Sequence, residues 1–232
     1  MINKSFYHGQ QGECFQKLEK HFEEIRHEYL SQPNKTFLSK DFFYEVNSDP
    51  RLKPTKMENY SNVFLGDDPD PRLEPTKGEW KILGIGCGKH EGQSFSDYPM
   101  LYSILRKFPY KINVAFMVVG PGTKIPKHKD DEGGWRYQMC IDDGGDQSGM
   151  YYKDVETGKE KLHNWKTGEA IVFQPGIQSH NGYNNNPRER VTLLIDFYKE
   201  SLYTKEKFDA YYQQYSEMFG GLENLKAEYD KM

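Results

Sequence analysis

WKTGEAIVFQPGIQSHNGYNNNPRERVTLLIDF, residues 165–197, alternates short apolar runs with turns. The run at 170–174 leads into a Pro-Gly turn, and the run at 190–198 follows a loop rich in asparagine. Short apolar runs bounded by Gly, Pro and Asn are typical of β-strands, because helices in globular proteins are usually longer. This part of the chain therefore predicts strands joined by turns.

The same alternation extends upstream as far as residue 79. Further strands are predicted at 80–86, 112–119, 136–141, 149–153 and 161–165. The turns between them contain Gly, Asp and Pro, which favour tight turns for distinct steric reasons. Many short strands at this spacing predict a mainly β fold with flanking helices. We expect a double-stranded β-helix, the jelly roll of cupin-like proteins.

Helical patterns flank this β region. Apolar residues recur at three- and four-residue steps in 11–30, which predicts one amphipathic helix, and a shorter helix is expected at 99–108. We expect three parts, which are an N-terminal helical and irregular segment packing on the core (1–78), the jelly-roll core (79–200) and a C-terminal helical tail (201–232).

The C-terminal tail carries an aromatic stripe at helical spacing. Its residues are Phe208, Tyr211, Tyr212, Tyr215 and Phe219. Such a stripe usually packs, here against the barrel or against a second copy of the chain. A homodimer formed through this helix is therefore one prediction.

Composition narrows the class of protein. Hydrophobic residues make up 36% of the chain, but 15% are aromatic, so a few large side chains can form a core. The net charge of −4 gives no basic footprint for nucleic acid. No apolar run is long enough for a membrane span and the first residues do not resemble a signal peptide, so we expect a cytoplasmic location. Cys14, Cys87 and Cys140 are widely spaced and are interpreted as packing residues.

Two histidines are candidate metal ligands. His128 precedes Asp130 by two positions, so on an extended segment both side chains face the same way, although chance alone often produces such a pair. Asp131 is an alternative carboxylate. A facial triad for non-haem Fe(II) needs a second imidazole. His180, shortly after a predicted strand and a Pro-Gly turn, is the best candidate.

Arg190 begins the last predicted strand. Strand alternation puts Arg190, Thr192, Leu194 and Asp196 on one face. A guanidinium that points into a barrel needs an anionic partner, and a small dicarboxylate would supply one. An exposed arginine on a solvent face is the alternative interpretation.

Several of these stretches together resemble a known family. PGTKIPKH (121–128), WRYQMCI (135–141) and residues 165–197 are similar, in order and spacing, to the aspartyl/asparaginyl β-hydroxylase family of Fe(II)/2-oxoglutarate oxygenases. The resemblance covers about residues 79–198. It implies a jelly-roll fold and an oxygenase that uses Fe(II), 2-oxoglutarate and O2.

The resemblance also implies residue roles. His128 and His180 match the iron-binding histidines, and Arg190 matches the residue that pairs with the distal carboxylate of 2-oxoglutarate. Some family members lack a carboxylate ligand at the position of Asp130, so this chain is more similar to three-ligand oxygenases. Arg136 and Gln138 lie on a strand that presents polar groups towards the co-substrate or substrate.

The predicted activity is hydroxylation of an unactivated C–H bond in a small molecule, an amino acid or a peptide side chain. Trp135 and Lys129 are candidate substrate contacts at the rim of the site. Two alternatives remain at this point: a cupin-type metalloenzyme that does not use 2-oxoglutarate, and a non-enzymatic jelly-roll module whose aromatic residues bind carbohydrate.

Overall fold

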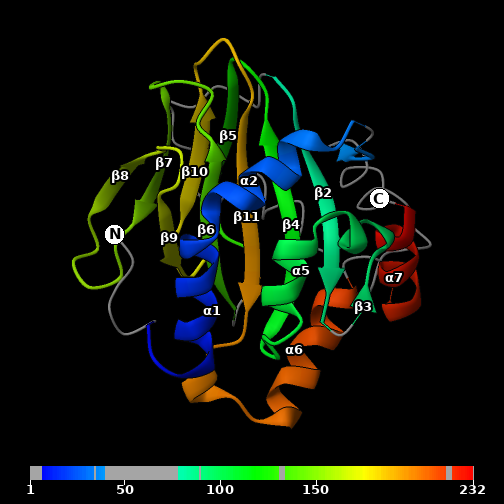
Figure 1. Cartoon of the computed structure of the whole chain (residues 1–232). Helices are drawn as coiled ribbons and strands as arrows, with labels where there is room; N and C mark the ends of the chain where they lie inside the picture. The colour runs from blue at the N-terminus through cyan, green and yellow to red at the C-terminus, as the bar shows by residue number, and fades with distance from the viewer. Residues whose placement is uncertain are drawn as a thin grey trace, which may run out of the picture.

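Two antiparallel β-sheets pack face to face, with helices on the outside of the larger sheet (Figure 1). The computed structural model describes residues 7–33, 35–39, 78–88, 90–130, 134–217 and 221–231. Within these ranges the chain forms the predicted jelly roll. Most of the predicted N-terminal irregular segment lies outside them.

The larger sheet joins strands from distant parts of the sequence. Its order is β1 (Leu38–Ser39), β2 (Trp80–Cys87), β4 (Lys111–Val119), β11 (Arg190–Phe197), β6 (Trp135–Asp142) and β9 (Ala170–Phe173), with β3 (His90–Glu91) paired to β2. The smaller sheet has the order β5 (Thr123–His128), β10 (His180–Asn184), β7 (Ser148–Lys153) and β8 (Glu160–Asn164). Neighbouring strands are mostly non-consecutive in sequence, as in a jelly roll.

Strand β11 lies inside the larger sheet and is buried along its whole length. The alternation that the sequence predicts is confirmed. Val191, Leu193 and Ile195 belong to the main hydrophobic core on the helix-covered face, whereas Arg190 reaches carbonyl groups of the smaller sheet. The space between the two sheets therefore receives the polar face of β11.

Helices α1 (Gly9–Lys20), α2 (Phe22–Ser31) and α5 (Pro99–Leu105) cover the outer face of the larger sheet (Figure 1). The prediction of one helix over 11–30 is wrong, because His21 has φ −102° and ψ 27° and separates α1 from α2. The break changes the direction of the chain while both helices keep contact with α5. The apolar positions Phe15 and Ile25 are fully buried, as the periodicity predicts.

Short 3₁₀ helices complete the connections at Gln93–Asp97 and Glu200–Leu202. The C-terminal helices are α6 (Lys205–Glu217) and α7 (Leu222–Lys231); α7 lies beside β2, and α6 packs against α7 (Figure 1). The aromatic stripe contacts its own chain: the Tyr212 hydroxyl donates a hydrogen bond to the Cys87 carbonyl at 3.0 Å, and Phe208 is buried. Phe219 lies outside the described residues, and the homodimer stays a prediction.

The three cysteines are buried and unpaired. Burial raises the pKa of the Cys14 and Cys140 thiols to about 12 and that of Cys87 to about 11. These thiols stay protonated at neutral pH and act as small apolar groups. None of the described helices is long and apolar enough to cross a bilayer.

The packing of α1 on the sheet gives a first prediction. Phe15 is fully buried, stacks on Tyr137 at a ring-centroid distance of 4.5 Å and meets the Phe197 ring edge-on at 5.2 Å. The substitution Phe15→Ala should lower the free energy of unfolding by about 3–5 kcal/mol, because it leaves a cavity between helix and sheet. Chemical denaturation would measure this change.

Leu30→Ala is the matched control, because the Leu30 side chain is 52% exposed. It should change stability by no more than about 0.5 kcal/mol. If Phe15→Ala were equally mild, the N-terminal helices would not belong to the same cooperative unit as the jelly roll.

Candidate metal centre

Strand pairing brings His128 and His180 together. His128 ends β5 and His180 begins β10, and the two residues are Cα partners in the antiparallel register of these strands. Directly opposed residues point to the same face of a sheet. The two imidazole rings lie side by side, with their centroids 4.3 Å apart. The strand register therefore makes neighbours of two residues that are far apart in sequence.

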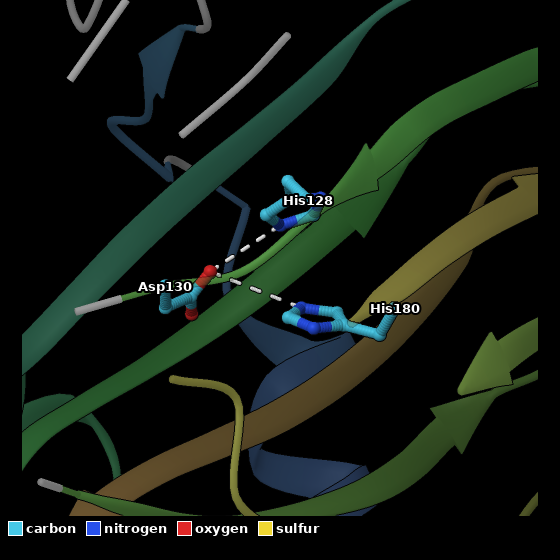
Figure 2. Close-up of side chains that lie close together, drawn as sticks. All are labelled: His128, Asp130 and His180. Atoms are coloured by element: carbon cyan, nitrogen blue, oxygen red, sulfur yellow. Dashed lines mark ion pairs between the residues drawn. The ribbon is translucent and has the colours of Figure 1, made fainter. Parts of the chain in front are cut away.

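Asp130 completes a group of three metal-binding side chains. Figure 2 shows its carboxylate turned towards both imidazoles. Its Oδ1 lies 3.3 Å from His128 Nε2 and 3.8 Å from His180 Nε2. One donor atom of each residue falls within 4.8 Å of the others, a spacing that suits a single ion. The backbone N–H of Asp130 donates to the Pro175 carbonyl at 3.1 Å, which anchors the segment after β5.

Backbone carbonyls determine which ring nitrogens are available. His128 Nδ1 lies 2.8 Å from the Pro126 carbonyl, and His180 Nδ1 lies 2.9 Å from the Gln178 carbonyl. A carbonyl can only accept, so each Nδ1 carries a proton and Nε2 is the ring nitrogen left to coordinate a metal. Metal-binding histidines are commonly oriented by this kind of second hydrogen bond. Both Nε2 atoms face the Asp130 carboxylate.

Burial keeps His180 neutral. His180 is 5% exposed, and the Phe173 ring meets its imidazole edge-on at a centroid distance of 5.2 Å. Burial, assisted by the neighbouring His128 ring, lowers the pKa of His180 to about 3. The imidazole is therefore unprotonated at neutral pH, which is the form that coordinates metal.

Arg136 holds the other oxygen of Asp130. Its Nη1 lies 2.8 Å from Asp130 Oδ2, and its Nε lies 2.7 Å from Asp196 Oδ1. Burial alone would raise the pKa of the Asp130 carboxyl, but the Arg136 guanidinium and the two imidazoles outweigh it and hold that pKa well below its usual range. Asp130 is thus an anion with Oδ1 left to the imidazoles.

Arg190 is a buried cation farther along the same interior. It is 2% exposed, and its Nη1 donates to the Tyr183 carbonyl at 2.9 Å. Within the described part of the chain its Nε has no hydrogen-bond partner and no carboxylate forms an ion pair with it. Burial lowers the pKa of Arg190 to about 10, which still leaves the group charged. A buried cation without a counter-ion is suited to receive an anion.

The remaining predicted site residues differ in whether they face the triad. Gln138 is buried on the inner face, where its Nε2 donates to Thr192 Oγ1 at 2.9 Å. Trp135 lies on the opposite face of β6 from Arg136, packs against the main core and lies under the Lys199 ammonium. Trp135 therefore does not face the triad. Lys129 is exposed between two of its members, and Asp131 is outside the described residues.

Sequence reasoning missed two groups near Arg190. The centroid of the Trp165 ring lies 5.5 Å from the Cζ atom of Arg190. The His163 ring meets the Trp165 ring edge-on, with a centroid distance of 4.5 Å. Trp165 Nε1 and His163 Nε2 are buried without a hydrogen-bond partner in the described part of the chain. The register that pairs His163 with Met150 puts it on the inner face, which the isolated sequence of β8 does not reveal.

Solved structures with similar folds come from several protein classes. An oxidoreductase of the 2OG-Fe(II) oxygenase family from Burkholderia pseudomallei aligns over 69% of this chain and 90% of its own, with 9% identity and a TM-score of 0.43. A predicted oxalate decarboxylase from Thermotoga maritima aligns over 56% of this chain and 90% of its own, with 17% identity and a TM-score of 0.33. No curated protein matches the sequence significantly.

One sequence family accounts for most of the chain. The sequence model of the aspartyl/asparaginyl beta-hydroxylase family matches residues 19–200. This range includes every described strand, the His128, Asp130 and His180 group, and Arg190. The chain therefore belongs to the aspartyl/asparaginyl β-hydroxylase family of Fe(II)- and 2-oxoglutarate-dependent hydroxylases.

Proposed function

We propose that His128, Asp130 and His180 bind the Fe(II) of this hydroxylase and that Arg190 binds the distal carboxylate of 2-oxoglutarate. The observation that carries the proposal is the convergence of three donor atoms within 4.8 Å of one another. Two imidazoles and one carboxylate are the ligand set of a facial Fe(II) site, which leaves positions open for other ligands.

The spacing between the triad and Arg190 supports the second part of the proposal. Arg190 donates to the carbonyl of Tyr183, three residues along β10 from His180. Three residues of strand span about 10 Å, which a metal-bound 2-oxo dicarboxylate can bridge. The Trp165 indole N–H, beside the guanidinium, is a second donor for the same carboxylate.

In this arrangement the protein residues orient the reactants and exclude water. Bound iron and 2-oxoglutarate would supply the oxidation itself, in which O2 is consumed, the 2-oxo acid becomes succinate and CO2, and a C–H bond is hydroxylated. The side chains of His128, Asp130 and His180 would hold the ion. Arg190 fixes the far end of the co-substrate, and the apolar side chains Met150 and Phe173 line the interior.

We propose a small molecule, an amino acid or a peptide side chain as the substrate. Lys129, exposed beside the triad, is a candidate contact for it. Arg136 and Gln138 already have protein partners on the inner face, so their proposed role towards co-substrate or substrate is to shape the polar wall of the site. Family membership supports an enzyme rather than a carbohydrate-binding module.

Metal binding tests the triad. Wild-type protein should bind Mn(II), a redox-stable substitute for Fe(II), with one ion per chain in isothermal titration calorimetry. His128→Ala and His180→Ala should weaken binding by more than the roughly 10- to 100-fold typical of losing an outer-shell partner. His27→Ala is the control, because His27 is exposed on α2. Unchanged affinity in both triad variants would refute this assignment.

Co-substrate affinity tests Arg190. In the presence of Mn(II), Arg190→Met should weaken 2-oxoglutarate binding about 10- to 100-fold, because it removes a charge-assisted hydrogen bond while keeping most of the volume. Arg188→Met is the matched control, since the Arg188 side chain is 64% exposed and pairs with Asp142 on the surface. Equal effects of the two substitutions would contradict the assignment.

Turnover tests the substrate class. Succinate release from 2-oxoglutarate should rise above its basal rate when the correct compound is added from a panel of free amino acids, small organic acids and short peptides. His180→Ala should abolish both rates. Intact 2-oxoglutarate binding without stimulation by any member of the panel would count against these substrate classes.

A further inference from the structure

A row of buried polar groups continues from the candidate metal centre across the larger sheet. Arg136 on β6 is the Cα partner of Asp196 on β11, and the guanidinium grips this carboxylate through Nε at 2.7 Å and Nη2 at 3.3 Å. The same guanidinium binds Asp130 through Nη1. One cation therefore bridges the candidate metal ligand and a second carboxylate.

The row extends one strand farther. Asn113 on β4 is the Cα partner of Asp196, and its Nδ2 donates to Asp196 Oδ2 at 3.1 Å. Asn113 Oδ1 in turn accepts a hydrogen bond from the hydroxyl of Tyr229 on α7. Asn113, Asp196 and Tyr229 are 7%, 5% and 3% exposed, so these bonds are shielded from solvent.

The Tyr229 hydroxyl determines how the Asn113 amide is oriented. An amide has one accepting end and one donating end, and a carboxylate can only accept. The hydroxyl donates to Oδ1, which leaves Nδ2 directed at Asp196. A flipped amide would place its oxygen against the carboxylate, which is unfavourable in a buried site.

The C-terminal helices also approach Gly134, two residues before Arg136. The Tyr211 hydroxyl on α6 lies so close to Gly134 that a Cβ at this position would collide with it. The Tyr215 hydroxyl lies 3.4 Å from that of Tyr229. These helices lie beyond residues 19–200, which the family model matches.

We infer that Tyr229, Asn113 and Asp196 are positioning residues for the metal centre, so that the C-terminal helices stabilise the orientation of Asp130 through Arg136. This inference depends on the proposed function, because it takes Asp130 as a metal ligand. It adds a structural requirement: the tail must be docked for the carboxylate to be held with Oδ1 towards both imidazoles.

The net charge around Asp130 predicts how substitutions in this row affect metal binding. Two carboxylates and one guanidinium leave the cluster of Asp130, Arg136 and Asp196 with one net negative charge, which favours a cation at the triad. When a substitution removes the charge of Asp196, Asp130 becomes the only carboxylate that pairs with Arg136. The guanidinium then competes with the metal ion for the Asp130 carboxylate. When only the Tyr229 hydroxyl is removed, the charges remain but Asn113 loses its fixed orientation.

Mn(II) affinity of the full-length protein tests the inference. Asp196→Asn should weaken Mn(II) binding about 10- to 100-fold, the range for loss of an outer-shell partner, and Tyr229→Phe about 10-fold. Asp196→Glu should recover part of the loss. The electron paramagnetic resonance spectrum of bound Mn(II) should also broaden in Tyr229→Phe, since the ligand geometry becomes heterogeneous.

Tyr212→Phe is the matched control. It removes another tail hydroxyl that donates a hydrogen bond, but to the backbone carbonyl of Cys87, which lies opposite Asn113 on β2 and is not part of the hydrogen-bonded chain from Asp130 to Tyr229. It should lower the melting temperature of the metal-free protein about as much as Tyr229→Phe and leave Mn(II) affinity unchanged. Equal loss of affinity in both tyrosine variants, or wild-type affinity in Tyr229→Phe and Asp196→Asn, would overturn the inference. If the wild-type protein did not bind Mn(II), this result would contradict the proposed function itself rather than only the role of the C-terminal helices.

Discussion

The antiparallel register between β5 and β10 is the constraint on which the candidate site depends. It places His128 opposite His180, and their rings then share one face of the smaller sheet. A shift of one residue would send one imidazole to the other face, because side chains alternate along a strand. Asp130 is reached simply by continuing the chain beyond β5. A single pairing therefore sets both ligand direction and ligand spacing.

The interior between the sheets combines paired and unpaired charge. Near the triad, Arg136 is neutralised by Asp130 and Asp196, which offsets the cost of burying three charges. Arg190 instead has only carbonyl groups and an aromatic face around it within the described residues. Arg136 is therefore paired with carboxylates, whereas Arg190 is the cation that we propose to bind an anion. This difference also explains why burial lowers the pKa of Arg190, whereas the carboxylates of Asp196 and Asp130 raise the pKa of Arg136.

The sequence predicts this interior where the pattern is local. Alternation along 190–197 gives the face of Arg190 correctly, and turn residues give the strands. Side chains alternate along a strand, so the neighbours Trp135 and Arg136 cannot both face the site. In the structure Arg136 faces the site and Trp135 packs against the main core. The ion pair of Arg136 with Asp196 could not be predicted, because it depends on which strand lies beside β6. The break at His21 has no local signal either, since the apolar periodicity continues through it.

The smaller sheet and helix α7 contact opposite ends of β4. At one end of β4 the inner face is closed by the smaller sheet, where Ile125 packs against Val119 and Trp80. At the other end, around Asn113, Tyr229 of α7 is in contact instead. Water competes for hydrogen-bonding groups that are exposed, so the same hydrogen bonds are stronger when they are enclosed by protein. Helix α7 thus shields the hydrogen bonds of Asn113 and Asp196 from water. Because these bonds lead through Arg136 to Asp130, we expect the docking of the C-terminal helices to affect the candidate metal centre.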